Sequence, residues 1–293
     1  MGIPCLQPSF LSDMKKLSVK TTFNRQKPVS AAEFLAELSG LSKMRIKDAM
    51  NKGAVWIRKK KGGLQKLRKA SADLLPGAMI ELYYDETLLS QKPPQARCVS
   101  DQGHYSIWFK PAGLLSQGTK YGDHCSLLRQ AELFWGPQRK IYLVQRLDRE
   151  ASGLMLIGHR KEAAAKLSAL FQNDRITKKY RTEVKGNLLE KGPSGTMRGT
   201  IDLPLDGKKA VTEYEVEAYD PVRNLSTVWV IIRTGRMHQI RRHFEMLGFP
   251  VIGDPRYGRG NKNDTGMRLE AISLAFRCPF SGKDVEYRLD TCE

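Results

Sequence analysis

An aspartate flanked by arginines is the feature of this chain best suited to chemistry. Residues 145–154 read QRLDREASGL, which places Asp148 between Arg146 and Arg149. Neighbouring cations favour an ionised carboxylate, which suits a nucleophile or a general base better than a proton donor. The alternative is a structural one, in which Asp148 only pairs with an arginine or begins a turn.

The segments on either side of this aspartate are short and apolar. Residues 141–144 and 153–158 have the composition of buried strands, so we expect Asp148 on the loop that joins them. An acid on a loop held by a rigid scaffold is well placed to face a cleft.

A second segment carries a cluster of basic and polar residues. Residues 234–243 read TGRMHQIRRH and follow the Val-, Ile- and Trp-rich residues 225–233, which suit a central strand. Thr234 and Gly235 break that strand, and a helix is expected from residue 236 to residue 247, ended by Gly248. A strand, turn and helix in this order can direct basic side chains at an anion near the helix start.

The two segments together resemble the signature motifs of the RluA family of RNA pseudouridine synthases. The usual forms of these motifs are His-Arg-Leu-Asp-x-x-Thr-Ser-Gly and Gly-Arg-x-His-Gln-Ile-Arg. Three shorter stretches resemble other parts of the family pattern, namely WFKPAG at residues 108–113, KKYR at 178–181 and GDPRYG at 253–258. Two positions depart from it, because Gln145 stands in place of the usual histidine and Ala151 in place of the usual threonine.

The resemblance implies roles for individual residues. Asp148 would be the catalytic residue, and Tyr180 would pack against the target base. A basic residue of the second motif would pair with the aspartate, and Arg241 is favoured over Arg236 for this role. Further substrate contacts would come from Arg146, Arg149, Lys110, Arg236, His238 and Gln239.

The implied reaction is the isomerisation of uridine within RNA. Asp148 would either attack the anomeric carbon or remove the neighbouring ribose proton, and both routes stay open. No cofactor is expected, because nothing is oxidised and no group is transferred. Two other classes compete: a catalytically silent RNA-binding relative, and a nuclease or metal-dependent phosphotransferase. The last should show clustered acidic ligands, which the sequence lacks.

Composition independently favours a polyanionic partner. The 293 residues carry a formal net charge of +18, and neutralisation of phosphates by Lys and Arg dominates affinity for nucleic acid. The five cysteines are scattered without a Cys-x-x-Cys pair, and the five histidines lack ligand spacing, so no metal site is expected. No apolar run is long enough for a membrane span. We expect a cytoplasmic monomer whose partner is RNA, ribosomal RNA being favoured over transfer RNA.

The chain divides near a proline-containing polar stretch. The expected parts are an extension at residues 1–17, a small domain at 18–90, a linker at 91–97 and a catalytic domain at 98–293. In the small domain, Ser30 and Ser42 are suited to cap helices ending near Gly40 and Gly53, and strands are expected at 54–57 and 79–84.

This pattern resembles the S-four-like RNA-binding domain, which is named after a ribosomal protein. The basic residues that would contact RNA there are Lys43, Arg45, Lys47, Arg58, Lys59, Lys60 and Lys61.

The fold class that the family resemblance implies for the catalytic part is α+β. It combines a mixed, largely antiparallel bent sheet with flanking helices and a cleft across the sheet, preceded by the small α/β domain. The expected order of helices and strands is compatible with this class.

Overall fold

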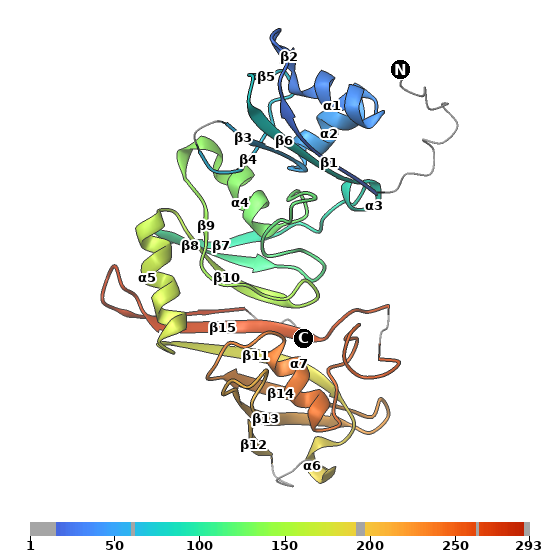
Figure 1. Ribbon diagram of the computed structural model, residues 1–293. Coiled ribbons are helices and arrows are strands. Elements are labelled where there is room, and N and C mark those ends of the chain that lie inside the picture. The colour runs from blue at the N-terminus through green and yellow to red at the C-terminus, as the bar shows by residue number, and fades with distance from the viewer. Residues whose placement is uncertain (1–15, 60–61, 192–196, 262–263, 290–293) are drawn as a thin grey trace. The chain divides into compact units, whose positions relative to one another are not determined.

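The computed structural model describes residues 16–59, 62–191, 197–261 and 264–289. The chain forms two compact units. The first comprises residues Met1–Pro93 and Gln117–Arg129, and the second comprises Pro94–Ser116 and Gln130–Glu293 (Figure 1). No helix within the described residues is long and apolar enough to cross a membrane.

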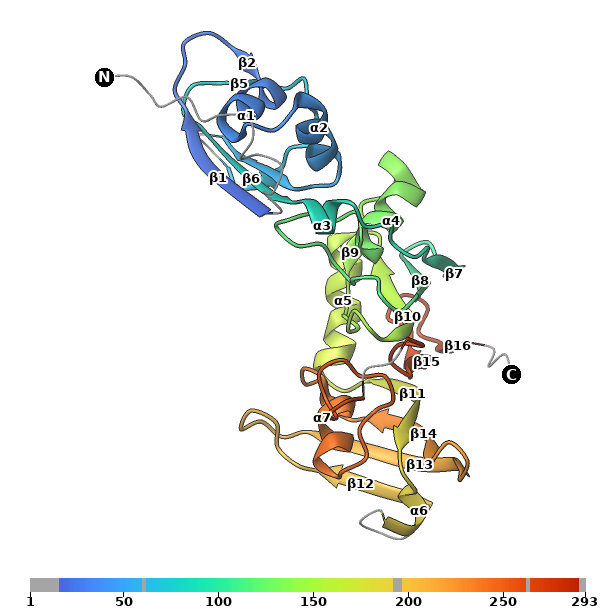
Figure 2. The ribbon, with the colours of Figure 1, turned by 90° about the vertical axis from the view of Figure 1, so that its right-hand side faces the viewer.

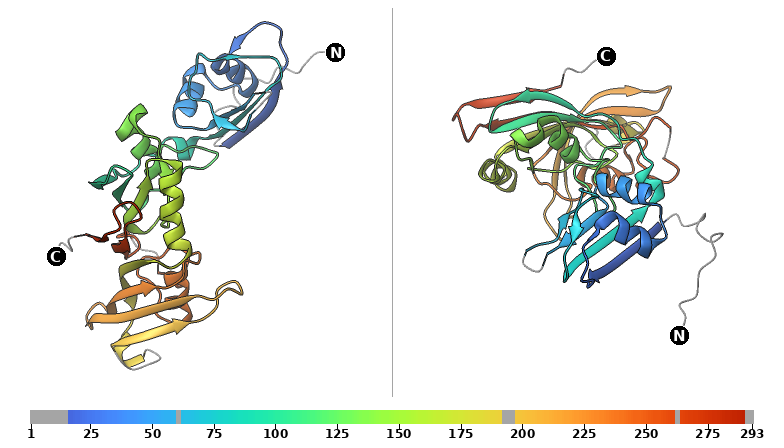
Figure 3. Two further views of the ribbon diagram at one scale, coloured as in Figure 1. Left: turned by 90° about the vertical axis from the view of Figure 1, so that its left-hand side faces the viewer. Right: turned by 90° about the horizontal axis from the view of Figure 1, so that it is seen from above.

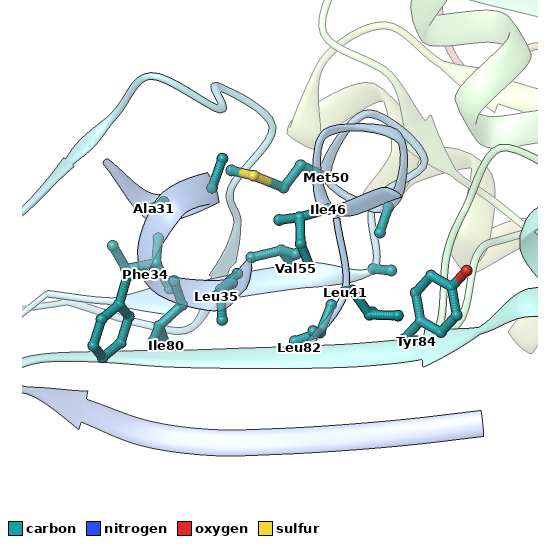
Figure 4. Packing of buried hydrophobic residues seen from close by; sticks show 14 of the residues in the cluster. Ala31, Phe34, Leu35, Leu41, Ile46, Met50, Val55, Ile80, Leu82 and Tyr84 are labelled. Atoms are coloured by element: carbon teal, nitrogen blue, oxygen red, sulfur yellow. The ribbon is translucent and has the colours of Figure 1, made fainter. Parts of the chain in front are cut away.

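The first unit is a four-stranded sheet with two helices on one face. The sheet has the order β1-β6-β3-β4, and all of its neighbouring strands are antiparallel. Its elements are β1 (Lys16–Phe23), β2 (Val29–Ser30), α1 (Ala31–Ser39), α2 (Lys43–Asn51), β3 (Val55–Arg58), β4 (Gln65–Lys66), β5 (Asp73–Leu74), β6 (Ala78–Asp85) and α3 (Glu86–Leu89). Apolar side chains of α1 and α2 pack on β3 and β6 to form its core (Figure 4).

Both predicted helices of this unit are confirmed, together with their caps. The Ser30 side chain accepts a hydrogen bond from the Glu33 amide, and the Ser42 side chain accepts one from the Arg45 amide. Gly40 adopts the left-handed conformation after α1, with φ of 71°. Of the α2 residues, Ile46 is completely buried. The sequence supported these helices because caps and apolar spacing agreed locally.

Strand β1 was not predicted. Residues 16 and 17 fall in the expected N-terminal extension but belong to β1, while the remainder of that extension, residues 1–15, lies outside the described residues. The strand alternates exposed Lys16, Ser18 and Lys20 with half-buried Leu17 and Val19. This period of two was the signal that could have revealed it.

Residues 117–129 correct the expected domain boundary. The sequence-based division gave all of residues 98–293 to the second domain, whereas residues 117–129 pack with the first unit. Asp123 accepts hydrogen bonds from Lys66 and Arg68, and the Trp56 indole donates to the Lys120 carbonyl over 2.9 Å. These contacts join residues more than 50 positions apart, which no local pattern reports.

The second unit is built on a ten-stranded sheet. Its main order is β12-β13-β14-β11-β15-β10-β8-β7, with β16 paired to β15 and β9 paired to β10. Its elements are β7 (Arg97–Asp101), β8 (Tyr105–Lys110), η2 (Gly136–Gln138), β9 (Tyr142–Leu143), β10 (Ser152–Gly158), α5 (Lys161–Gln172), β11 (Ile176–Lys185), α6 (Leu188–Lys191), β12 (Arg198–Asp202), β13 (Val211–Asp220), β14 (Leu225–Ile232), α7 (Gln239–Met246), β15 (Leu269–Arg277) and β16 (Asp284–Arg288). Helix α4 (Leu127–Trp135) begins in the first unit and ends in the second.

This sheet confirms the expected mixed, largely antiparallel α+β class. The only parallel pair within the described strands joins β10 to β15 through two residue pairs. Two cores lie along the sheet: α7 packs with β13 and β14, and α5 packs with β8 and β10. Figures 2 and 3 show α5 and α7 beside these different groups of strands. The parallel pair is therefore the place where the two groups of strands meet.

Two predicted elements differ from the structure. The strand expected at 141–144 is reduced to Tyr142–Leu143, which is half-buried instead of buried. The helix expected from residue 236 begins only at Gln239, because His238 has φ of 53° and no right-handed helix can continue through it.

Gly153 allows β10 and β15 to approach closely, because it has no side chain. Its φ is 121°, and an added Cβ would lie 2.3 Å from the Ala271 carbonyl oxygen and 2.4 Å from the Ala271 nitrogen. Replacing Gly153 with alanine should therefore destabilise the protein by roughly 3 kcal/mol, through backbone strain and overlap with the neighbouring strand. Denaturant unfolding measures this change. The matched control is Gly235→Ala, because no atom lies within 4 Å of a Cβ there. Equal free energies of unfolding for the two variants would contradict the prediction that a side chain at residue 153 strains the contact between β10 and β15.

Candidate active site

Asp148 lies on the loop between β9 and β10, as the sequence indicated. Its neighbours anchor this loop on both sides. The Leu147 amide donates to the Ser116 hydroxyl over 3.0 Å, and that hydroxyl donates back to the Leu147 carbonyl over 2.7 Å. On the other side, the Gly113 amide donates to the Arg149 carbonyl over 2.7 Å. The backbone around Asp148 is therefore fixed, while its side chain remains 27% exposed.

Lys110 supports the same loop from below. Its ammonium donates to the carbonyls of Leu114 at 2.9 Å, Arg149 at 3.3 Å and Ala151 at 2.5 Å, and also to that of Pro111. Lys110 is fully buried and its ammonium is bound by backbone carbonyls, whereas the expected substrate contact by this residue stays a prediction. Burial lowers its pKa to about 8, an effect that the carboxylates of Asp148 and Glu150 oppose.

The two departures from the family pattern are accommodated within this scaffold. The Gln145 side-chain oxygen accepts a hydrogen bond from the Leu156 amide over 3.3 Å, which ties the start of the loop to β10. Ala151 is 3% exposed and packs in the core beneath α7. Both residues therefore fill structural positions that hold the loop.

Arg241 on α7 contacts two aspartates from different loops. Its Nη1 donates to Asp148 Oδ2 over 2.8 Å, while Nε and Nη2 donate to the two carboxylate oxygens of Asp254 over 2.6 and 2.8 Å. The same Nη1 lies 3.6 Å from Glu150 Oε2. The predicted pairing of Asp148 is thus made by Arg241, the favoured residue, and not by Arg236.

The ion pair between Arg241 and Asp254 is buried, since these residues are each 1% exposed. Burial lowers the pKa of Arg241, but the hydrogen bonds that it donates to Asp254 and Asp148 outweigh this effect, and the net pKa is raised. Burial raises the pKa of Asp254, but the bonds from Arg241 and from the amides of Arg256 and Tyr257 leave it lowered overall. Both groups are therefore charged at neutral pH, and the guanidinium is held in one orientation.

His238 lies on the other side of the Asp148 carboxylate. Its Nε2 is 3.7 Å from Asp148 Oδ1, and its Nδ1 is 3.1 Å from the Tyr257 hydroxyl. Burial is the main cause that lowers the pKa of His238, although Asp148 opposes it. A neutral imidazole next to a carboxylate can donate a hydrogen bond without adding a charge.

Tyr180 lies on β11 at an irregularity of the sheet. The pairing of β11 with β15 shifts register between Lys179 and Tyr180, which is the pattern of a β-bulge. Bulges redirect side chains and are common beside active sites. Burial raises the pKa of the Tyr180 phenol, and the charge of Asp148 raises it further, so the phenol stays protonated at neutral pH.

The other residues predicted to contact the substrate differ in exposure and in their distance from Asp148. Arg146 and Arg149 are exposed beside Asp148. Arg236 points elsewhere, since its Nε donates to the Lys209 carbonyl over 2.9 Å. Gln239 is 3% exposed and bonds with Thr212, Thr234 and neighbouring backbone groups, so it ties the start of α7 to β13, and its expected substrate contact stays a prediction.

Five of the seven basic residues predicted to contact RNA in the first unit lie within the described part of the chain. Lys43, Arg45, Lys47, Arg58 and Lys59 are exposed. Lys60 and Lys61 lie outside the described residues.

The sequence did not indicate the roles of Asp254, Ser116 and Glu150. Asp254 belongs to the stretch GDPRYG, whose likeness to the family pattern was noted without assigning it a partner. A buried arginine needs more than one acceptor, which was the available signal for a second carboxylate. Among the described residues, no group of three or more His, Cys, Asp and Glu side chains could hold a metal ion.

Comparisons with known proteins give matches that agree with one another. The family model described as RNA pseudouridylate synthase matches residues 104–246. Ribosomal large subunit pseudouridine synthase D of Zymomonas mobilis is 30% identical over 222 residues, covering 64% of this chain and 67% of that protein. An uncharacterized RNA pseudouridine synthase of Aquifex aeolicus is 30% identical over 261 residues, covering 81% of this chain and 78% of that protein.

A solved structure shares the fold. Human RNA Pseudouridylate Synthase Domain Containing 1 matches with a TM-score of 0.57 and 22% identity, covering 68% of this chain and 86% of that protein. At this identity the likeness supports the fold alone.

The buried ion pair should dominate local stability. Asp254→Asn removes a charge that Arg241 needs, so we expect a loss of about 3 kcal/mol near neutral pH. Because folding lowers the pKa of Asp254, its stabilising effect is present above the unfolded value of about 3.9 and is lost as pH falls through the folded value. The difference between wild type and variant, from denaturant unfolding at several pH values, should therefore shrink below about pH 4.

The control for this change is Asp206→Asn. Asp206 pairs with Arg242 but its side chain is 66% exposed, so its loss should leave the stability nearly unchanged. If Asp254→Asn lowers the free energy of unfolding no more than Asp206→Asn does, the buried pair of Arg241 and Asp254 does not stabilise the protein.

Lys110→Met should loosen the loop that carries Asp148. The four carbonyls that Lys110 binds would lose their donor in a buried site, and we expect destabilisation of about 3 kcal/mol. Amide hydrogen exchange in residues 145–151 should rise. The exposed Lys161→Met serves as control and should leave both measurements unchanged. Unaltered exchange in Lys110→Met would show that the loop is held by other contacts.

Proposed function

The chain belongs to the RNA pseudouridine synthase family, and from this premise we propose that it isomerises uridines of ribosomal RNA with Asp148 as the catalytic residue. The observation that carries the proposal is the placement of Asp148. Its carboxylate is partly exposed, yet one oxygen is fixed by the buried Arg241 at 2.8 Å. A fixed, ionised carboxylate open to a substrate is what nucleophilic or general-base chemistry at a ribose requires.

The reaction breaks the bond between C1′ of the ribose and N1 of uracil, and the electron pair stays with the base. The freed uracil turns, a bond forms between C5 and C1′, the proton at C5 leaves, and N1 takes up a proton, so that the product is an isomer of the substrate. Nothing is oxidised or reduced overall. Asp148 acts in one of two ways: it bonds to C1′ and is then displaced, or it removes the C2′ proton to give a C1′–C2′ double bond and later returns it.

Arg241 and Tyr180 assist in different ways. Arg241 keeps the Asp148 carboxylate ionised and directed at the ribose, and Asp254 in turn prevents Arg241 from moving away. Tyr180 provides a protonated, partly buried ring from the bulge in β11, and we propose that it packs against the uracil while the base turns. His238 Nε2 lies 3.7 Å from the Asp148 oxygen that Arg241 leaves open, which is too long for a direct hydrogen bond, so its effect on the carboxylate is electrostatic.

The substrate base must leave the RNA stack to reach Asp148. Unstacking costs a few kcal/mol, and side chains that occupy the vacated place lower that cost. The exposed Arg146, two residues before Asp148, is our candidate for this role. A planar guanidinium can stack on neighbouring bases and contact phosphates.

Ribosomal RNA is favoured over transfer RNA by two considerations. One relative is named for the large ribosomal subunit, and the first unit resembles an S-four-like RNA-binding domain. Mapping of pseudouridines in total RNA from a deletion strain, complemented with wild type or an Asp148 variant, identifies the target. A lost site in ribosomal RNA that only wild type restores supports the proposal, whereas a lost site in transfer RNA alone overturns this choice of substrate.

Asp148→Asn should abolish catalysis while preserving the fold. The amide keeps the size of the side chain but cannot act as nucleophile or base, so the rate should fall by at least about a thousandfold. Release of tritium from RNA labelled at C5 of uridine reports the rate, since that proton leaves during isomerisation. Asp206→Asn is the matched control and should keep full activity. Activity of Asp148→Asn within tenfold of wild type would refute the role.

RNA carrying deuterium at C2′ of uridine separates the two routes. Removal of the C2′ proton would slow a single turnover of the deuterated RNA severalfold. Attack at C1′ breaks no bond to that hydrogen, so the two RNAs would then react at nearly equal rates.

A further inference from the structure

The sheet of the first unit has a face that α1 and α2 do not cover. Directly opposed residues of antiparallel strands share a face, and β1 pairs Lys16 with Asp85, Ser18 with Tyr83 and Lys20 with Glu81. The alternating residues of β6, Ile80 and Leu82 among them, belong to the core under the helices (Figure 4). The side chains opposite them therefore lie on the uncovered face.

This uncovered face gathers cations and aromatic rings. We call it the basic sheet face and define it by Lys16, Lys20, Trp56, Arg58, Lys120 and Tyr121. The four cations are exposed and the two rings are partly exposed.

The carboxylates near this face lie beneath the cations. Glu81 is 8% exposed, and the side chains of Asp85 and Asp123 are 21% and 9% exposed. Glu81 accepts a hydrogen bond from the Tyr83 hydroxyl, and Asp123 accepts from Lys66 and Arg68. Negative charge is thus held inside the unit while positive charge is presented to solvent.

Residues 117–129 complete the face. The Tyr121 ring packs edge-on against the Tyr83 ring, with centroids 5.5 Å apart. The Lys120 ammonium lies 4.9 Å from the Tyr83 ring centroid and 5.3 Å from that of Tyr121, and Lys16 lies 4.5 Å from the Tyr121 centroid. The Trp56 indole also donates to the Lys120 carbonyl. These contacts place cations and rings side by side in fixed positions.

The helix pair on the other face differs in charge. Lys43 pairs with Glu33 at 2.7 Å, Arg45 with Glu86 at 3.3 Å and Lys52 with Asp48 at 2.8 Å. The partner carboxylates are 43–51% exposed, so they cancel much of the positive field at the surface. Two of the α2 residues that the sequence indicated as RNA contacts, Lys43 and Arg45, are therefore paired with exposed carboxylates.

We propose that the basic sheet face binds single-stranded RNA, with the four cations contacting phosphates and Tyr121 and Trp56 stacking on bases. Grooves that combine cations with aromatic rings bind single strands, because each base offers a ring face and each nucleotide a phosphate. An acidic protein would use the cations but not the rings. The inference rests on the proposed function, in which RNA is the substrate, and assigns its contact to the sheet instead of the helices.

The test compares two triple variants of the full chain, each of which removes three positive charges. The first is Lys16→Ala with Lys20→Ala and Lys120→Ala, and the second is Lys43→Ala with Arg45→Ala and Lys47→Ala. The probe is a fluorescein-labelled oligouridine of about twelve nucleotides, and anisotropy is followed from low to moderate salt. Asp148→Asn is added to all proteins, so that binding is measured without turnover.

The sheet variant should bind about tenfold or more weakly, and the slope of log affinity against log salt should fall by about two, because each lost single-strand phosphate contact contributes about 0.7. The helix variant should change affinity by about twofold or less. Tyr121→Leu should weaken binding by about fivefold or more, whereas Tyr121→Phe should not, since a stacked base contributes about 1–3 kcal/mol.

Equal effects of the two triple variants, or a larger effect of the helix variant, would overturn the inference. So would equal binding by Tyr121→Leu and Tyr121→Phe, which would leave only charge attraction. The tritium-release assay with the catalytically intact chain reports the proposed function separately. If the wild-type chain isomerises uridine but the sheet variant binds RNA as well as wild type, only the proposed binding site is refuted. If the sheet variant loses RNA binding but the wild-type chain shows no isomerisation, only the proposed reaction is refuted.

Discussion

The arrangement of the candidate site depends on one buried guanidinium. Arg241 uses one edge to bind both oxygens of Asp254 and its remaining nitrogen to bind Asp148. A buried arginine without partners would be severely destabilising, and the second carboxylate makes its burial possible. With its other donors committed to Asp254, Arg241 presents one N–H in a fixed direction. Asp148 therefore receives an oriented partner whose position is set by a group that need not touch the substrate.

The loop of Asp148 is fixed by contacts of a different kind. Lys110, Ser116 and the Gly113 amide bind backbone groups on both sides of it. Hydrogen bonds to carbonyls and amides do not depend on the identity of the loop side chains. This explains how the chain accommodates Gln145 and Ala151 at positions where the family usually has histidine and threonine. Two different sets of residues therefore position Asp148: one set holds the backbone of its loop, and the other orients its carboxylate.

Sequence alone predicted the fold class, the helices α1, α2 and α7, the strands β3, β6, β10 and β14, and the pairing of Asp148 with Arg241. These predictions relied on local periodicity and on motif order, which are properties of short segments. The sequence could not show which polar residues of the motifs are buried in the folded protein. Lys110 and Gln239 are polar members of motifs, and polarity suggested substrate contact, whereas both are enclosed by the fold. The late start of α7 could not be foreseen either, since nothing local marks His238 for a left-handed conformation.

The close approach of β10 and β15 at Gly153 has a consequence for how the protein is made. Gly153 pairs with Ala271, a partner 118 positions later in the chain. The partners of Asp148, Arg241 and Asp254, likewise lie far along the sequence. During synthesis from the N-terminus, the aspartate leaves the ribosome long before the residues that orient it. Contacts of such long sequence separation form slowly, because the intervening chain must first be closed into a loop. The ion pairs around Asp148 are therefore among the last contacts that this polypeptide acquires.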